Sequence, residues 1–278
     1  MKNKKIKIVV SALLVGIVGM GLTACGNGSS KENGSKTTIS ISGSTSVGPL
    51  IDKIAEKYEE SNKTVSIEVQ QTGSSAGIKD TINGVNEIGM VSRELKAEEE
   101  SEVNGTIIAF DGIALIVNKA NKVDDITTEQ IKDIYTGKIN NWKELGGEDA
   151  PIVVVSREEG SGTRSAFQEL IGYESEELTK DATICDGNGN IKSTVLSNEN
   201  AIGFVSFEYL KDDIKALTVN GVVANPENVK AKTYTLSRPF IITTKEGNIT
   251  DNGQAFIEYI LGEDGQEIVS ESGFITLE

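Results

Sequence analysis

The sequence predicts an α/β fold with largely parallel sheets, and three observations lead to this prediction. Short β-branched runs, such as TTISISG at 37–43 and PIVVVS at 151–156, alternate with amphipathic segments along the chain. One such segment, VGPLIDKIAEKYEE at 47–60, places its apolar residues at helical spacing. Glycine followed by small hydroxyl residues recurs where a strand gives way to a helix, and glycine allows the sharp turn that such a junction needs.

The first 24 residues have the features of a secretory signal rather than of the fold. Lysines in the first seven residues precede an apolar run at 8–22, which is short for a membrane-spanning helix of about 20 residues. The run ends in Leu22-Thr23-Ala24-Cys25, which resembles the bacterial lipobox and implies cleavage before Cys25 and attachment of a diacylglycerol to its thiol. An uncleaved N-terminal anchor is the alternative. Residues 25–37, rich in Gly, Ser, Asn and Lys, are expected to form a flexible tether.

The body that follows the tether contains an ordered series of strand and helix patterns. The segment at 106–118 reads as two apolar strand runs broken by Asp111-Gly112, and Thr127 with Gln130 forms a capping box before a helix. Strands are predicted at 37–43, 64–70, 87–92, 106–118, 151–156, 200–206 and 238–245. Helices are predicted at 47–60, 76–84, 127–137, 164–171, 252–261 and 264–271.

Composition excludes several classes of function. The formal net charge of the 278-residue chain is −15, and removal of the leader with its four lysines makes the body more acidic still, which argues against binding of nucleic acid. The chain has no histidine, which is the commonest general base and metal ligand. After Cys25 only Cys185 remains, so no internal disulfide can form. No zinc or EF-hand spacing occurs, and we expect neither a metal nor a cofactor.

Three glycine-hydroxyl turns carry the main functional signal. They are Gly43-Ser44-Thr45-Ser46, Gly73-Ser74-Ser75-Ala76 and Gly160-Ser161-Gly162-Thr163. Helix N-termini expose unpaired N–H groups and a partial positive charge, which together favour an anion. Each turn taken alone is more simply explained as an ordinary N-cap. Because ligands of α/β proteins bind at the carboxyl ends of the strands, three such turns can converge on one anion.

Two arginines stand at strand ends near these turns. VSRE occurs at 91–94 and again at 155–158, which places Arg93 and Arg157 after predicted strands. A guanidinium is the natural bidentate partner of a tetrahedral oxyanion. Pairing with nearby acids such as Glu94 or Glu159 is the structural alternative, and both can hold if a carboxylate orients the arginine fork.

Enzymatic explanations find little support. Gly73-Ser74-Ser75-Ala76-Gly77 fits the G-x-S-x-G pattern of a hydrolase nucleophile, but the chain has neither histidine nor an S-x-x-K pair to activate a serine. The P-loop pattern is also absent. We therefore expect binding without chemistry and assign no catalytic residue.

These segments resemble one known family. SGSTSVGPL, QTGSSAGI, IGMVSRELK, DGIALIVN, IYTGKINNWKELGG, SREEGSGTRSAF and AIGFVSFEYL occur in the order found in the phosphate-binding lipoproteins of bacterial high-affinity phosphate ABC transporters, in their Gram-positive form. The resemblance covers roughly residues 40–245. It implies a two-lobed, periplasmic-binding-protein-like (type II) fold with two crossover strands and a ligand cleft between the lobes. On this basis lobe 1 is expected at 38–117 plus 237–278 and lobe 2 at 118–236.

The resemblance also implies a set of phosphate-binding residues. The first lobe would supply Thr45, Ser46, Ser74 and Ser92, and the facing lobe would supply Arg157, Ser161, Gly162 and Thr163. Glu159 stands where the family commonly has an acid that orients the arginine, Ser44 is expected to assist, and Arg93 either binds the ligand or braces the cleft. Many relatives have an aspartate in place of Ser92, which accepts the proton of hydrogen phosphate. Here a hydroxyl must accept it, or Asp111 or Glu158 must reach the ligand.

The expected function is capture of inorganic phosphate outside the cytoplasmic membrane by hinge closure and its delivery to an ABC importer. The implied partners are two permease subunits and two ATP-binding subunits, with membrane attachment through lipid at Cys25 only. A binding protein for sulfate, molybdate or tungstate would share the fold and the turns. A serine hydrolase and a phosphate sensor or surface adhesin are the remaining alternatives.

Overall fold

The computed structural model describes residues 36–277. The predicted signal at 1–24, the lipidation site Cys25 and nearly all of the tether lie outside the described residues. Among the described residues, no helix is both long and apolar enough to cross a bilayer. The strands are β1 (Thr37–Gly43), β2 (Val65–Gln71), β3 (Ile88–Val91), β4 (Asn104–Val117), β5 (Asp125–Ile126), β6 (Val153–Arg157), β7 (Thr183–Cys185), β8 (Ala201–Ser206), β9 (Lys215–Ala216), β10 (Thr218–Val219) and β11 (Ser237–Thr244).

Helices lie between these strands and after the last of them. The α-helices are α1 (Gly48–Ser61), α2 (Ser74–Ile82), α3 (Ala97–Glu100), α4 (Thr128–Tyr135), α5 (Gly162–Ile171), α6 (Gly187–Ser197), α7 (Pro226–Lys230), α8 (Asp251–Leu261) and α9 (Glu263–Glu271). The short 3-10 helices are η1 (Trp142–Leu145), η2 (Ser175–Glu177) and η3 (Phe207–Tyr209). The α/β prediction is therefore confirmed for the described residues, and the predicted capping box forms, because Thr127 and Gln130 exchange hydrogen bonds at the start of α4.

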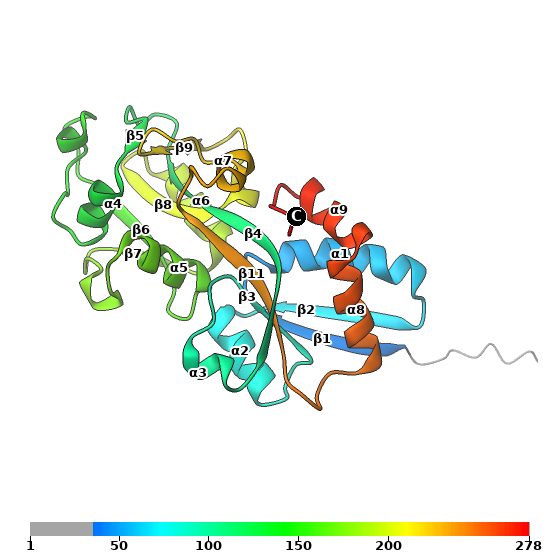
Figure 1. Ribbon diagram of the computed structural model, residues 1–278. Helices are drawn as coiled ribbons and strands as arrows, with labels where there is room; N and C mark the ends of the chain where they lie inside the picture. The colour runs from blue at the N-terminus through cyan, green and yellow to red at the C-terminus, as the bar shows by residue number, and fades with distance from the viewer. Residues whose placement is uncertain (1–35, 278) are drawn as a thin grey trace, which may run out of the picture. The chain divides into compact units, whose positions relative to one another are not determined.

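Nine of the strands form one long sheet with the order β2-β1-β3-β11-β4-β8-β6-β7, in which β9 also pairs with β4, and β5 and β10 form a separate two-stranded sheet. Pairing is parallel at each end of the sheet, between β1 and its neighbours and between β6 and its neighbours. The two middle strands, β4 and β11, are antiparallel to each other and to the strands that flank them. The sheet is thus two parallel α/β halves joined by an antiparallel pair (Figure 1).

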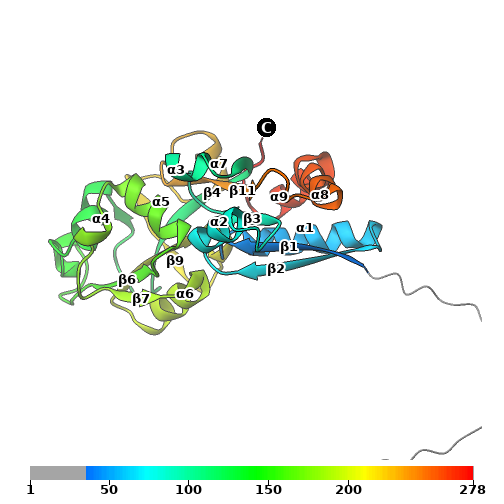
Figure 2. The same cartoon turned by 90° about the horizontal axis from the view of Figure 1, so that it is seen from below.

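Two separate hydrophobic cores define two lobes. We call the first lobe the part built on β1–β3, where Leu50 and Ile54 of α1 pack with Phe256 of α8. We call the second lobe the part built on β6–β8, where Phe167 of α5 stacks on Phe204 of β8 with ring centroids 4.1 Å apart. Figures 1 and 2 show α1, α8 and α9 gathered at one end and α4, α5 and α6 at the other. Each lobe therefore has its own cluster of buried apolar side chains, whose removal from water stabilises it.

The crossover strands connect the lobes close to Asp111. In β4, Ile108 and Ala109 belong to the first core, whereas Ile113 belongs to the second. The boundary that we expected at Val117–Asn118 is therefore wrong, because Val117 pairs with β8 inside the second lobe. In β11, Leu236 at its entry packs in the second core and Phe240 in the first, so Arg238 lies at the second crossover.

The segment 106–118 is one continuous strand rather than two. Asp111 does not break it, because its carboxylate lies against Arg238, the residue opposite it on β11. Gly112 is required for space and not for a turn, since an added Cβ atom would lie 2.0 Å from the Phe207 ring. Asp111 followed by Gly112 resembles a turn signal in the sequence. In the structure Asp111 pairs with Arg238 and Gly112 makes room for Phe207, and both residues belong to a strand that crosses between two cores.

Candidate functional site

The three predicted turns lie together where the two lobes meet. The first follows β1, the second begins α2, and the third follows β6 and begins α5. Gly43 takes a positive φ of 139°, and a Cβ atom there would lie 2.2 Å from the Met90 carbonyl oxygen, so the residue must be glycine. The turns therefore occupy the carboxyl ends of parallel strands in both half-sheets, which is where α/β folds bind ligands.

Hydroxyl groups at two of the three turns are not used as helix caps. The N-cap of α1 is Val47 and the N-cap of α2 is Gly73, and neither helix has a side-chain cap. Only Ser161 caps its helix, by accepting the N–H of Arg164 at 3.2 Å. The explanation of all three turns as ordinary N-caps is therefore insufficient, because the hydroxyls of the first two turns cap neither α1 nor α2.

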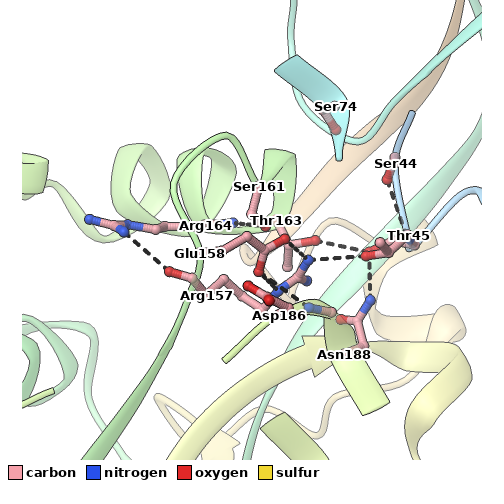
Figure 3. Close-up of polar contacts among 12 residues, drawn as sticks. Ser44, Thr45, Ser74, Arg157, Glu158, Ser161, Thr163, Arg164, Asp186 and Asn188 are labelled. Atoms are coloured by element: carbon pink, nitrogen blue, oxygen red, sulfur yellow. Dashed lines mark hydrogen bonds and ion pairs between the residues drawn. The ribbon is translucent and has the colours of Figure 1, made fainter. Parts of the chain in front are cut away.

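Polar groups from the two lobes contact each other directly at these turns. Ser46 Oγ lies 2.9 Å from Thr163 Oγ1, and Arg157 Nη2 donates to Thr45 Oγ1 at 3.0 Å (Figure 3). The backbone N–H of Ser75 donates to the carbonyl of Gly160 at 3.2 Å. Four of these residues belong to the predicted set, and Ser75 and Gly160 belong to its turns. The two side-chain contacts join residues that are 117 and 112 positions apart in sequence.

Arg157 is the charged centre of the site. Its side chain is 1% exposed, and its Nε and Nη2 each donate to the Glu158 carboxylate at 2.7 Å. Among the described residues Nη1 has no hydrogen-bond partner although it is buried. Such an orphan donor on a guanidinium calls for a further acceptor, because leaving a buried charged donor unpaired is costly.

Glu158, and not Glu159, orients this arginine. Glu159 is exposed, whereas Glu158 is half-buried and also accepts the N–H of Gly187 at 3.2 Å. Burial raises the pKa of Glu158, but hydrogen bonds and charge from Arg157 outweigh it and leave the pKa below its ordinary value. Our assignment of the orienting acid to Glu159 is therefore wrong by one residue, because the strand directs Glu158 toward the guanidinium.

A cluster of serines surrounds the start of α5. Ser44 Oγ accepts the N–H groups of Ser46 and Val47 and donates to Ser92 Oγ at 2.9 Å. Ser74 Oγ accepts the N–H of Ser92 and lies 3.3 Å from Ser92 Oγ. All the serine hydroxyls in this cluster come from the first lobe.

Gly162 of the second lobe fits against this cluster. A Cβ atom on Gly162 would lie 2.2 Å from Ser74 Oγ and 2.8 Å from Ser92 Oγ. Only a residue without a side chain lets the lobes approach this closely.

Arg93 braces the first lobe, and within the described residues its terminal nitrogens make no hydrogen bond to the hydroxyls of the three turns. Both of its terminal nitrogens donate to the Glu99 carboxylate at 2.7 Å, and Nη1 also donates to the carbonyl of Glu94. Arg93 thus pairs with a neighbouring acid as expected, but that acid is Glu99. Arg93 contacts Glu94 only at its backbone carbonyl. With both terminal nitrogens occupied, only Nε of Arg93 is without a hydrogen-bond partner among the described residues.

Asn188 is a site residue that the sequence analysis missed. Asn188 lies beside the first turn (Figure 3), and its side chain is 1% exposed. It donates to Ser46 Oγ at 3.0 Å and accepts the N–H of Ser206 at 3.2 Å. The run Asp186-Gly187-Asn188-Gly189 follows β7 and begins α6, so it repeats the strand-glycine-helix arrangement of the other turns. That repetition was the available signal, but the polar composition of the run concealed the helix.

A buried ion pair supports the site from the crossover strands. Arg238 Nη2 donates to Asp111 Oδ2 at 2.9 Å, and Nη1 donates to the carbonyl of Ser92 at 3.0 Å. Asp111 also accepts the N–H of Phe207, which belongs to the second lobe. Full burial raises the pKa of Asp111, and the charge of Arg238 opposes that shift. Through its bond to the Ser92 carbonyl, Arg238 fixes the backbone that follows β3. Asp111 is paired with Arg238 and is therefore not available to a ligand.

The arrangement provides many hydrogen-bond donors and one guanidinium for a small anion. Between residues 36 and 277, no group of three or more His, Cys, Asp or Glu is placed to hold a metal ion. The donors come from both lobes, so an anion between them would hold the lobes together.

Two α/β lobes that share an antiparallel crossover pair and present ligand groups at their junction define a solute-binding protein of the periplasmic-binding-protein class. The model of the PBP superfamily domain matches residues 28–264. The chain belongs to the PstS family of phosphate-binding proteins. The phosphate-binding protein PstS of Bacillus subtilis is 35% identical to it over 98% of this chain and 94% of that protein. The PstS of Borreliella burgdorferi is 30% identical over 88% of this chain and 92% of that protein.

Solved structures agree with this assignment. A Clostridium perfringens protein, described as a phosphate ABC transporter substrate-binding protein and solved with bound phosphate, is 57% identical, with a TM-score of 0.86 over 87% of this chain and 100% of that chain. An ABC-type phosphate transport receptor from Vibrio cholerae is 36% identical, with a TM-score of 0.75 over 86% and 100% of the two chains.

Proposed function

We propose that this protein binds inorganic phosphate between its lobes and delivers it to an ABC importer. The buried Nη1 of Arg157, which has no partner among the described residues, is the observation that carries the proposal. The same guanidinium donates through Nη2 to Thr45 of the opposite lobe, and a phosphate oxygen is the acceptor that best suits a guanidinium. The names of the relatives support phosphate as the anion.

The hydrogen bonds that now join the lobes mark where phosphate would be held. Ser46 and Thr163 contact each other through their hydroxyls, and each can turn its proton toward an anion instead. Asn188 already donates to Ser46 Oγ, so the Ser46 proton is directed away from Asn188. The backbone N–H groups at the start of α5 add donors and a favourable dipole. Thr45, Ser46, Ser74, Ser161, Gly162 and Thr163 would then surround the ligand together with Arg157.

Ser92 is proposed as the acceptor that favours hydrogen phosphate over sulfate. Ser44 uses both acceptor positions on backbone N–H groups, so its proton is committed to Ser92 Oγ. With its own proton directed to Ser74 Oγ, 3.3 Å away, Ser92 Oγ keeps a second acceptor position, which the proton of hydrogen phosphate can fill and sulfate cannot. Asp111 and Glu158 do not compete for this role, because each is held by an arginine.

Phosphate binding would stabilise the closed arrangement of the lobes. β4 and β11 are the two strands that cross between the lobes, and they provide the hinge. A ligand that contacts both lobes has higher affinity for the closed state and shifts the population toward it. The closed form would then dock on two permease subunits that are served by two ATP-binding subunits.

Calorimetric titration with phosphate, in competition with sulfate and molybdate, tests the proposal. We expect tight binding of phosphate and weak binding of the competitors, with the preference reduced in the variant Ser92→Ala, where no hydroxyl accepts the ligand proton. Equal affinity for sulfate in the wild-type protein would instead indicate a general oxyanion-binding protein. Turnover of phosphate esters by purified protein would revive the hydrolase alternative.

We also propose that the protein is anchored at the extracytoplasmic face of the cell membrane through lipid on Cys25. The Leu22-Thr23-Ala24-Cys25 sequence supports this location. Metabolic labelling with a radioactive fatty acid should mark the wild-type protein and fail to mark Cys25→Ser. Labelling of the serine variant would place the lipid elsewhere.

A further inference from the structure

A second polar feature lies beside the phosphate site, on the outer side of the Ser161 turn. It is a groove of about 520 Å³ whose lining comes from both lobes. The first lobe contributes Ser75, Arg93 and Lys96, and the second contributes Glu159, Arg164 and Gln168. The remaining lining residues are serines and a glycine, so the groove contains no apolar side chain.

The groove is cationic although the protein as a whole is acidic. Three of its lining residues are positively charged, and one, the exposed Glu159, is negative. Glu99 neutralises Arg93 through a two-point ion pair. The side chain of Arg164 donates to the carbonyl of Arg157 and, between residues 36 and 277, has no paired carboxylate. The N-terminal turn of α5, which contains Arg164, also lies at the groove. Lys96 and Arg164 against Glu159 leave the groove with an excess of one positive charge, on a chain whose formal net charge is −15.

Unpaired buried donors gather at this groove. Arg93 Nε, Arg164 Nε and Gln168 Nε2 are all buried without a hydrogen-bond partner among the described residues. The Arg93 and Gln168 side chains are only 4% and 7% exposed. Buried donors without partners are rare in native proteins and often mark the position of a water or an ion. All three residues line this one groove and come from both lobes, so an acceptor bound in the groove is the group best placed to satisfy these donors after a small side-chain rotation.

We infer that the groove binds a second small oxyanion, outside the phosphate site and in contact with both lobes. The groups around it are N–H donors and cations, which suit a tetrahedral oxyanion better than a sugar or an amino acid. The site is more open than the one at Arg157 and carries an exposed lysine, so we expect millimolar affinity. Because it spans the lobe junction, an anion there would favour the closed form and slow the release of phosphate from the inner site.

Nuclear magnetic resonance of the arginine Nε–H groups tests this inference. The chain's arginines are Arg93, Arg157, Arg164 and Arg238, so the two sites report through different residues. Protein is first titrated with inorganic phosphate to saturation of the tight site and then taken to tens of millimolar, with sodium chloride of equal ionic strength as the control. We expect Arg157 to respond in the first transition and Arg93 and Arg164 to respond in a second, phosphate-dependent transition.

Two variants localise the second transition. Lys96→Gln should weaken it about two- to fivefold, the effect of one exposed charge, and Gln168→Leu should weaken it by removing an unpaired donor. Both should leave the first transition unchanged. Lys63→Gln, which removes an exposed lysine of the first lobe away from the groove, should change neither.

The inference is overturned if Arg93 and Arg164 shift no more with phosphate than with chloride, or if both groove variants retain the second transition unaltered. Absence of the first transition would count against the proposed function alone, because the second is measured at different residues.

Discussion

Replacement of Arg157 by lysine provides a sharp test of how the anion is held. The variant Arg157→Lys keeps the positive charge but loses the planar fork, of which Nε and Nη2 hold Glu158 and Nη1 is unpaired. A single ammonium cannot satisfy Glu158 and the ligand with the same geometry. The loss is one charge-assisted hydrogen bond, about 1.5–3 kcal/mol, which corresponds to an affinity for phosphate about 10- to 150-fold weaker.

Calorimetry with phosphate measures the effect, and Arg93→Lys is the matched control. Arg93 is equally buried but has both terminal nitrogens on Glu99, so its replacement should change phosphate affinity by less than about threefold. Wild-type affinity in Arg157→Lys would refute the role given to Nη1. An equal loss in Arg93→Lys would show that the effect of either substitution is not specific to the site.

Three further predictions concern lobe contact, the missed residue and pH. Gly162→Ala places a Cβ atom 2.8 Å from Ser74 Cβ. The overpacking cost of about 1–3 kcal/mol should weaken phosphate binding and enlarge the radius of gyration measured by small-angle scattering. Gly189→Ala is the control, because the space around Gly189 is open, and it should change neither quantity. Asn188→Ala removes a neutral hydrogen bond of about 0.5–1.5 kcal/mol and should weaken phosphate binding about two- to tenfold; unchanged affinity would exclude Asn188 from the site. Because Arg157 lowers the pKa of Glu158 below its ordinary 4.5, the stabilisation from this carboxylate is present above pH 4.5 and is lost as the pH falls through the folded-state pKa. The stability advantage of the wild-type protein over Glu158→Gln should therefore shrink in acid, and an advantage that is constant down to pH 3 in denaturant titrations would contradict the pairing.

Local sequence patterns were sufficient to predict most of the regular elements. The apolar spacing of Leu50, Ile51 and Ile54 gave α1, and the β-branched run at 151–156 gave β6, because each pattern reflects a single buried face. α6 was missed, since GNGN at its start lacks apolar periodicity and only Ile191 and Val195 are buried further along. Its position depends on contacts with β8 and with the first lobe, which no local pattern encodes.

The site was predictable as far as it consists of turns with recognisable residues. Thr45, Ser46, Arg157 and Thr163 do meet, as the glycine-hydroxyl motifs indicated. Residues 158 and 159 are both glutamate, so residue type does not distinguish them. Which of them contacts the guanidinium depends on the direction that the end of β6 gives to each side chain. The crossover near Asp111 likewise depends on the division of one apolar strand between two cores, which is a tertiary property.

A crystal structure of the protein with phosphate tests the central claim most directly, which is that one anion is held by hydroxyls, backbone amides and a guanidinium from both lobes. We predict phosphate oxygens within hydrogen-bonding distance of Thr45, Ser46 or Ser74 on one side and of Arg157 and Thr163 on the other. Phosphate that contacts residues of one lobe only, or that lies away from Arg157, would contradict the account.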